Sequence, residues 1–469
     1  MRAAHPPPAA DTTALSRLLG TALDALREGA RARGGPLPAG GPEAVARRVR
    51  EVLGEPFPET GRGSQEALRT LVRVLAEGAA DPADPLCAAH LHTPPLALAA
   101  AADLAASALN PSMDSWDQAP AASALEAEVT AALAAEVFPA APHPDALVTT
   151  GGTESNQLAL LLARERHGRV TTVVGANAHH SFRRAAWLLG LPEPVVVPTP
   201  SGTIDPEALR ETLRETLRET LHGAPARTDG GPVLVAATAG TTDGGLIDPL
   251  PEIAEVCAGA RAELHVDAAY GGPVLFSSVH RRLLDGLDRA RTVTVDLHKL
   301  GWQPAAAGLL AVRDAADLAV LGHTADYLNA DDDTEAGLPD LLGRSLRTTR
   351  RPDVLKTAVT LRALGRTGLG ALVDRCMELA QDLADRVEKA PGLDLRERPV
   401  LTTVLFRPTG ADDTTVAAIR RALLTEGRAV LGRAEADGRL WLKATLLNPH
   451  ATPGDLDRIL TLVEGGTHR

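Results

Sequence analysis

The stretch TVTVDLHKLGWQP, residues 292–304, places a lysine, Lys299, shortly after a run of β-branched residues. Such a run predicts a buried β-strand, so Lys299 falls where the strand ends. A lysine at this position is either a solvated charge that closes the strand or an amine withdrawn from water. His298 precedes it, and a desolvated lysine beside a histidine can act as a neutral nucleophile. Taken alone, the stretch leaves both interpretations open.

Short β-branched runs alternate with longer helical patterns from about residue 120 onward, which predicts an α/β fold with a mostly parallel sheet. The predicted strands lie within residues 145–152, 170–175, 192–199, 231–240, 262–270, 291–298 and 308–314. This order places several strand ends at one edge of the sheet, where open α/β sheets bind ligands.

Two further regions flank this pattern. Leucine and valine at helical spacing predict N-terminal helices over residues 13–32, 43–54 and 64–78. A long helix to about residue 383, a strand within 400–408 and a helix near 413–426 predict a smaller α+β domain. We therefore divide the chain into a helical N-terminal segment (1–89), a large domain (90–360) and a C-terminal α+β domain (361–469).

Composition excludes several classes of function. The 469 residues include 48 Lys and Arg against 60 Asp and Glu, a formal charge of -12 that disfavours nucleic acid and anionic membranes. Cys87, Cys257 and Cys376 are too few for a disulfide framework, which predicts a reducing, cytoplasmic location. The sequence shows neither a signal-peptide pattern nor a membrane span.

Two other segments place polar groups after predicted strands. Gly151 and Gly152 allow close backbone approach, and Thr153 starts a helix whose free N–H groups suit a phosphate. A capped turn explains the same pattern equally well. Asp267 follows an apolar strand, where an ionised carboxylate needs a cation or hydrogen-bond donors as partners. A helix-capping aspartate is the alternative.

The three segments together favour the ligand-binding interpretation. A Gly-rich cradle, an Asp and a Lys, in this order, are what pyridoxal 5'-phosphate (PLP) requires. The helix start takes the phosphate, the Asp keeps the pyridine nitrogen protonated, and the Lys attaches the cofactor covalently. The protonated ring then accepts electrons from the α-carbon of an amino acid. The sequence therefore predicts Lys299 as the nucleophile.

The chain resembles a known family, the pyridoxal-dependent group II amino-acid decarboxylases. These enzymes have PLP fold type I, the aspartate aminotransferase-like fold. The motifs that carry the resemblance are HLHTPPLA (90–97), NPSMDSWDQAPAASALE (110–126), TTGGTESNQLAL (149–160), HVDAAYGG (265–272), DLHKLGWQP (296–304) and LLGRSLRTTRR (341–351). The chain is most similar to the bacterial branch with diaminobutyrate decarboxylases and the lysine or diamine decarboxylases of siderophore pathways.

The resemblance implies roles for individual residues. Lys299 carries the cofactor, Asp267 pairs with the pyridine nitrogen and His179 stacks on the ring, with the adjacent His180 as the alternative for that place. The implied cofactor-binding residues are Gly152, Thr153, His179, Thr238, Asp267, Ala269, His298 and Lys299. The implied substrate-binding residues are His92, Thr93, Pro94, Trp116 and Gln118. A homodimer with a shared active site is also implied.

The two adjacent histidines also raise the possibility of a metal site. Neither a carboxylate nor a cysteine lies at ligand spacing from them, so no metal is predicted. Asp114 and Asp117 offer negative charge for a basic substrate, although acidic loop residues are more often simply solvated.

The expected reaction is the α-decarboxylation of an L-amino acid to an amine and carbon dioxide. The resemblance favours a basic side chain, as in lysine, ornithine or diaminobutyrate. The first alternative is an aldehyde synthase or another PLP enzyme of specialised metabolism. The second is a non-catalytic binding protein, which would more naturally have lost Lys299 or Asp267.

The proton donor separates the expected reaction from the first alternative. In the family a tyrosine on a mobile loop protonates the carbanion, and the acidic segment 323–344 matches such a loop. Tyr327 is the only tyrosine there, but counting back from LLGR reaches Glu335, with Leu338 nearby. Tyr327 is therefore either the donor or an apolar anchor. We expect decarboxylation with another donor, His179 or water, or else a shift towards aldehyde products.

Overall fold

The computed structural model describes residues 7–222, 232–322, 328 and 331–466. The chain forms two compact units. The first combines Met1–Pro94, Leu379–Arg398 and Val404–Arg469, and the second combines Pro95–Glu378 and Pro399–Thr403. The N-terminal helices thus belong to the same unit as the C-terminal sheet. The division into three segments expected from the sequence remains a prediction.

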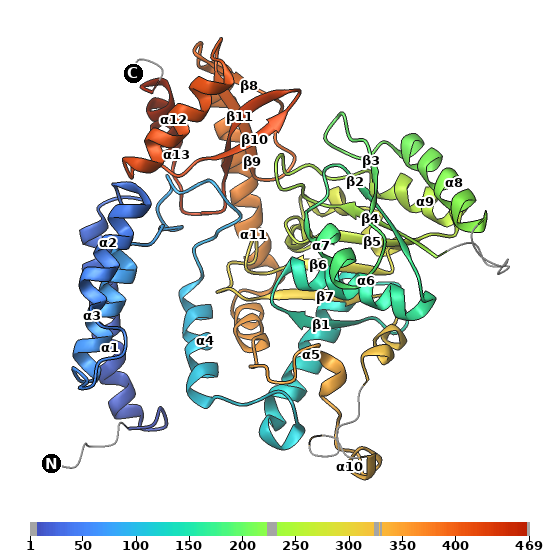
Figure 1. Ribbon diagram of the computed structural model, residues 1–469, viewed down its shortest axis with the longest axis horizontal. Coiled ribbons are helices and arrows are strands. Elements are labelled where there is room, and N and C mark those ends of the chain that lie inside the picture. The colour runs from blue at the N-terminus through green and yellow to red at the C-terminus, as the bar shows by residue number, and fades with distance from the viewer. Residues whose placement is uncertain (1–6, 223–231, 323–327, 329–330, 467–469) are drawn as a thin grey trace. The chain divides into compact units, whose positions relative to one another are not determined.

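The second unit is built on a seven-stranded sheet. Its strands are β1 (Asp145–Thr149), β2 (Thr171–Gly175), β3 (Val195–Val197), β4 (Val233–Thr238), β5 (Glu263–Ala268), β6 (Thr292–Asp296) and β7 (Gly308–Val312). They follow the order β1-β7-β6-β5-β4-β2-β3, which can be traced from bottom to top in Figure 1. Only β7 runs antiparallel to its neighbours β1 and β6. The predicted mostly parallel sheet and its seven strands are confirmed.

Helices accompany the strands of this unit. They are α4 (Ala97–Leu109), α5 (Pro120–Val137), α6 (Gly152–His167), α7 (Ser181–Leu188), α8 (Pro206–His222), α9 (Leu250–Ala260), α10 (Asp331–Glu335) and the start of α11 (Val354–Lys389). Short 3-10 turns are η1 (Trp116–Gln118), η2 (Gly272–Phe276), η3 (Arg281–Leu284), η4 (Leu287–Arg289), η5 (Ala315–Leu321) and η6 (Leu342–Arg344). Helix α6 packs against β6 and β7, and α9 packs against β4 and β5. Every residue of β4, β6 and β7 is buried, as a sheet covered by helices requires.

The first unit contains the predicted N-terminal helices and the small C-terminal sheet. Its helices are α1 (Thr12–Arg33), α2 (Gly41–Leu53), α3 (Ser64–Glu77), α12 (Asp413–Thr425), α13 (Pro453–Glu464) and the last part of α11. Its strands, in the order β10-β11-β9-β8, are β8 (Leu393–Leu395), β9 (Thr403–Pro408), β10 (Gly432–Ala436) and β11 (Arg439–Thr445). Phe406, Leu442 and Leu456 lie in its apolar core. The predicted α+β character of this region is confirmed.

The topology of the large sheet brings four strand ends together. Strands β4, β5 and β6 are parallel neighbours, and Thr238 is paired in register with Asp267, which in turn is paired with Thr294. Strand β1 is antiparallel to β7 and therefore points in the same direction as β6. The carboxyl ends of β1, β4, β5 and β6 thus share one edge of the sheet, where ligands bind in such folds. Within the described residues no helix has both the length and the apolarity needed to cross a bilayer.

Candidate active site

A glycine cradle lies between β1 and α6. Gly151 has φ +148°, and a Cβ at this position would lie 3.0 Å from the His298 ring. A Cβ on Gly152 would lie 3.0 Å from the Cβ of Ala269. Because a helix leaves its first N–H groups without partners inside the helix, these glycines open the start of α6 to a bound anion. Thr153 lies exposed in this first turn.

Lys299 follows β6 and forms an ion pair at the same edge. Its Nζ atom lies 2.9 Å from Oδ2 of Asp296, the last residue of the strand. The Asp296 side chain is 2% exposed and that of Lys299 is 19% exposed. Oδ1 of Asp296 is buried without a hydrogen-bond partner among the described residues. The lysine is therefore held at the edge of the sheet and is not a freely solvated charge.

His298 lies between the cradle and this ion pair. Its Nε2 atom is 3.7 Å from Oδ2 of Asp296, and its Nδ1 atom is 3.2 Å from the carbonyl oxygen of Ala307. Burial lowers the pKa of His298, with the nearby Asp296 acting in the opposite direction. The ring thus lies beside both the glycine cradle and the Asp296 carboxylate.

Asp267, the residue before the last in β5, is a buried carboxylate that accepts hydrogen bonds from two donors. Its Oδ1 atom accepts a hydrogen bond from the backbone N–H of Ala269 at 3.1 Å. Its Oδ2 atom accepts one from the side-chain amide of Asn156 at 2.7 Å. Asp267 does not cap a long helix, because only the short turn η2 follows it, from Gly272 onward. Donors of this kind stabilise the ionised form of a buried carboxylate.

Thr238 lies beside Asp267 in the neighbouring strand. It is 4% exposed, and its hydroxyl is buried without a hydrogen-bond partner among the described residues. Its backbone N–H donates to Oδ2 of Asp248 at 2.7 Å, and Oδ1 of Asp248 accepts from the Asn177 side chain and from the Ile204 backbone, each at 2.9 Å. Asp248 therefore fixes the loops around the end of β4, while the Thr238 hydroxyl stays available for a ligand.

His179 lies half-buried at the start of α7, next to the exposed His180. The Nδ1 atom of His179 accepts a hydrogen bond from the backbone N–H of Ser181 at 3.3 Å, so its neutral form carries the proton on Nε2. Burial lowers the pKa of His179, and the charge of Asp267 opposes this effect. His179 is thus the more buried of the two histidines, and its role in ring stacking remains a prediction.

The residues expected to bind the substrate lie in both units. His92, Thr93 and Pro94 belong to the first unit, where the Thr93 hydroxyl donates to the carbonyl oxygen of Leu447 at 3.4 Å. Trp116 and Gln118 belong to the second unit and form η1. The Gln118 amide donates to Oδ1 of Asp114 at 2.8 Å. Tyr327 lies outside the described residues.

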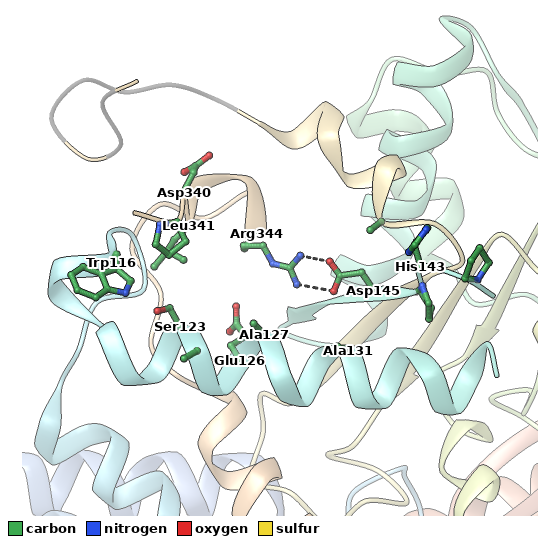
Figure 2. Close-up of a pocket in the computed structure, with 15 residues that line it drawn as sticks. Trp116, Ser123, Glu126, Ala127, Ala131, His143, Asp145, Asp340, Leu341 and Arg344 are labelled. Atoms are coloured by element: carbon green, nitrogen blue, oxygen red, sulfur yellow. Dashed lines mark hydrogen bonds and ion pairs between the residues drawn. The ribbon is translucent and has the colours of Figure 1, made fainter. Parts of the chain in front are cut away.

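Trp116 lines a cavity of about 640 Å³ along α5, which Figure 2 shows. The residues around it include Glu126 on α5, Asp145 at the start of β1, and Leu341 and Arg344 after α10. The glycine cradle follows the other end of β1, and none of its residues lines this cavity. The cavity is therefore separate from the cradle.

Two arginines of the LLGRSLRTTRR motif form ion pairs around this region. Arg344 contacts the Asp145 carboxylate and donates to the carbonyl oxygen of Ala146 at 2.6 Å, and its pair with Asp145 is drawn in Figure 2. Arg350 donates to both oxygens of Glu126, at 2.6 and 2.7 Å, in a fully buried pair. These arginines fix the start of β1 and helix α5.

Two residues of the candidate site, Asn156 and Asp296, were not predicted from the sequence. The spacing of each residue from a predicted site residue could have identified it. Asn156 follows Gly152 by four residues and therefore lies on the same face of the helix. Asp296 precedes Lys299 by three residues at the end of a strand. Among the described residues, no group of three or more His, Cys, Asp and Glu side chains is arranged to hold a metal ion.

Comparison with known proteins agrees with this geometry. Residues 47–409 match the family described as the pyridoxal-dependent decarboxylase conserved domain. The chain belongs to the pyridoxal-dependent decarboxylase family. It is a PLP-dependent amino-acid decarboxylase, a carboxy-lyase, as expected from the sequence.

Relatives and a solved structure are similar over most of the chain. An L-2,4-diaminobutyrate decarboxylase of Rhizobium meliloti (strain 1021) is 42% identical over 87% of this chain and 83% of the relative. One from Acinetobacter baumannii is 31% identical over 86% of this chain and 84% of the relative. A solved structure from Vibrio parahaemolyticus has a TM-score of 0.84 and 29% identity to this chain, covering 97% of this chain and 96% of that one. It is the glutamate decarboxylase domain of a diaminobutyrate-pyruvate transaminase and L-2,4-diaminobutyrate decarboxylase. The predicted resemblance to this branch is confirmed.

The residues of this decarboxylase fit PLP. Substituting Gly151 or Gly152 would fill the cradle, while the Thr238 hydroxyl and the Asp296 carboxylate each keep a buried oxygen without a partner among the described residues. Asp267 supplies a buried carboxylate with donors on both oxygens. The same edge of the sheet therefore offers a phosphate cradle, a partner for a pyridine nitrogen and an amine.

Proposed function

We propose that this decarboxylase converts L-2,4-diaminobutyrate to propane-1,3-diamine and carbon dioxide. The observation that carries the proposal is the placement of Lys299, Asp267 and the Gly151–Gly152 cradle at one sheet edge, in a chain 42% identical to a diaminobutyrate decarboxylase. The chemistry requires loss of the carboxyl group attached to the α-carbon and its replacement by a proton.

Each residue at the sheet edge has a separate role in the proposed reaction. When bound, PLP supplies a protonated pyridine ring that withdraws the electron pair left by the departing carboxyl group. Lys299 attaches the cofactor, and Asp267 holds the proton on the pyridine nitrogen. The first turn of α6 binds the phosphate, with Gly152 and Thr153 closest to it. Thr238 presents its hydroxyl to the hydroxyl side of the ring.

Three further residues surround the cofactor in this proposal. His179 lies against one face of the ring, and its neutral form presents the Nε2 proton. Ala269 packs beside Gly152, where a Cβ on the glycine would meet it at 3.0 Å. His298 borders Gly151 on the phosphate side.

Recognition of a second amino group requires negative charge. Asp114 is 9% exposed, and its side chain accepts a hydrogen bond from the neutral amide of Gln118. Among the described residues, no Lys, Arg or His side chain forms an ion pair with Asp114 or Asp117. Since a nearly buried carboxylate without a cation favours a charged ligand, we assign Asp114 to the distal ammonium group of the substrate.

The remaining substrate contacts depend on the assembly. We propose a homodimer with a shared active site, in which Trp116, Gln118 and the segment His92–Pro94 wall the substrate. The support is the family resemblance of the HLHTPPLA and SWDQAPA segments. Support for a reducing, cytoplasmic compartment comes from Cys87, Cys257 and Cys376, which are all free thiols. A diamine product suits siderophore or other specialised-metabolite synthesis.

A substrate panel tests this proposal. The PLP-loaded protein is incubated with L-2,4-diaminobutyrate, L-ornithine, L-lysine and L-glutamate, and the products are identified by mass spectrometry. We expect propane-1,3-diamine to form with the highest kcat/KM. Preferential turnover of glutamate would overturn the assignment of a basic substrate. In Asp114→Asn, KM for diaminobutyrate should rise more than KM for glutamate, with Asp24→Asn, on the exposed face of α1, as the control.

A further inference from the structure

Asn156 is the centre of a buried hydrogen-bond network beneath the candidate site. It lies on α6 and is completely buried. Its side-chain amide nitrogen donates to Asp267 at 2.7 Å and to the Ser181 hydroxyl at 2.9 Å. Its side-chain oxygen accepts from the Thr294 hydroxyl at 2.8 Å and lies 3.0 Å from Nε2 of His265. All four hydrogen-bonding positions of the amide are therefore occupied.

The charge of Asp267 fixes the orientation of this amide. An ionised carboxylate has no hydrogen to donate, so the amide nitrogen of Asn156 must face Asp267. The Asn156 oxygen then faces His265, whose Nε2 atom must carry a hydrogen. His265 is fully buried, and burial lowers its pKa to about 4, so the ring is neutral at neutral pH. Its Nδ1 atom accepts from the Thr292 hydroxyl at 2.8 Å.

The same amide connects the two residues assigned to the cofactor ring. On one side it holds Oδ2 of Asp267, whose other oxygen accepts from the backbone N–H of Ala269. On the other side it holds Ser181, whose backbone N–H donates to Nδ1 of His179. One rigid side chain thus lies between the partner of the ring nitrogen and the residue that lies against the ring face.

We propose that Asn156 is a positioning residue that sets the orientation of the Asp267 carboxylate and the separation of Asp267 from His179. Asn156 acts through these residues and not by touching the substrate. The Asn156 and Ala269 donors occupy one lone pair on each Asp267 oxygen, which leaves the carboxylate a defined direction towards the pyridine nitrogen. The inference rests on the roles proposed above for Asp267 and His179.

The variant Asn156→Asp tests this inference because it keeps the size of the side chain and the acceptor for Thr294. It replaces the amide nitrogen with an oxygen that faces Asp267. The two carboxylates then retain their contact only where they share a proton. We expect the Kd for PLP to rise about 10- to 100-fold at pH 8, because a hydrogen bond to a charged group is lost, and the rise to shrink towards pH 6. The absorbance spectrum of the bound cofactor should show the same pH dependence.

Thr294→Val is the matched control. It removes one donor to the Asn156 oxygen, is equally buried, and keeps both donors of Asn156 in place. A loss of packing alone would raise Kd similarly in both variants and at every pH. We expect the pH-dependent rise only in Asn156→Asp. Equal effects in the two variants, or wild-type Kd values for Asn156→Asp from pH 6 to pH 8, overturn the inference.

Two further measurements keep the test decisive. If circular dichroism shows that Asn156→Asp does not fold, Ser181→Ala removes only the acceptor that links Asn156 to His179. This variant should weaken PLP binding, and unchanged Kd would overturn the link to His179. Borohydride reduction of the wild-type holoenzyme tests the proposed function separately. A label on Lys299 together with an inert Asn156→Asp variant rejects only the present inference, whereas a label on another lysine rejects the proposed function.

Discussion

The Nζ atom of Lys299 lies 2.9 Å from Oδ2 of Asp296, three residues earlier in the chain. The Asp296 side chain is almost completely buried, and its other oxygen has no hydrogen-bond partner among the described residues. Lys299 is therefore the nearest cation to Asp296, and the pair holds the amine at the edge of the sheet.

This pair should contribute measurably to the stability of the cofactor-free protein. We expect Asp296→Asn to lower the free energy of unfolding by about 1–3 kcal/mol, because Lys299 keeps its charge without a partner. A double-mutant cycle with Lys299→Met should give a coupling free energy of similar size, about 1–3 kcal/mol, from urea unfolding at pH 7.5. Additive effects of the two substitutions would show that the pair contributes nothing.

Lys299 should be the covalent attachment site of the cofactor. Borohydride reduction of the holoenzyme, followed by proteolysis and mass spectrometry, should find the pyridoxyl group on the peptide that contains Lys299. Lys299→Ala should bind PLP only reversibly and lose turnover. Lys389→Ala serves as the control, because it lies at the end of α11 in the other compact unit. A pyridoxyl group on any other lysine contradicts the assignment.

Asp267→Asn should lower kcat far more than it changes KM. A neutral amide cannot hold the proton on the pyridine nitrogen, and the lost effect acts on the transition state. The hydrogen-bond network gives a second reason for the loss of activity. Asn156 and Ala269 each donate a hydrogen bond to one oxygen of Asp267, and the NH2 group of an asparagine at this position would face one of these donors without accepting its hydrogen bond. We expect kcat to fall about 100-fold or more, with Asp267→Glu retaining more activity because it keeps the charge. A near wild-type kcat in Asp267→Asn would reduce Asp267 to a structural role.

His265 should make the folded state less stable in acid. Its pKa falls from 6.5 to about 4 on burial, so the unfolded chain binds the proton more tightly. The stability contributed by the neutral ring is therefore complete above about pH 6.5 and is lost as the pH falls to about 4. Between pH 7 and pH 4.5 this amounts to about 2–3 kcal/mol. In denaturant unfolding across this range, the free energy of unfolding should depend less on pH in His265→Gln than in the wild type. The same pH dependence in both proteins would refute the assignment.

Tyr327→Phe decides the identity of the proton donor. We expect His179 or water, and not Tyr327, to donate the proton. We therefore predict that Tyr327→Phe forms the amine as the wild type does. The measurement is the ratio of amine to aldehyde product, together with ammonia and hydrogen peroxide, in air-saturated buffer. A switch to aldehyde, ammonia and peroxide, with oxygen as the oxidant, would instead make Tyr327 the donor.

Several features followed directly from the sequence. The strands that end at Thr149, Ala268 and Asp296 were predictable because short β-branched runs are bounded by glycine or polar residues. Their alternation with helices implied a mostly parallel sheet, which places the carboxyl ends of its parallel strands at one edge. The sequence therefore predicted that Lys299 and the Gly151–Gly152 cradle lie at the same edge of the sheet.

Only the tertiary structure showed which side chains face one another beneath that edge. The contacts of Asn156 with Asp267, His265 and Thr294 join one helix to two strands, over separations of more than one hundred residues. Periodicity predicts which face of an element is buried, but it does not specify the partner across the interface. The pairing of Lys299 with Asp296 likewise depends on the turn after β6, since three residues along a straight strand would separate the two side chains by about 10 Å.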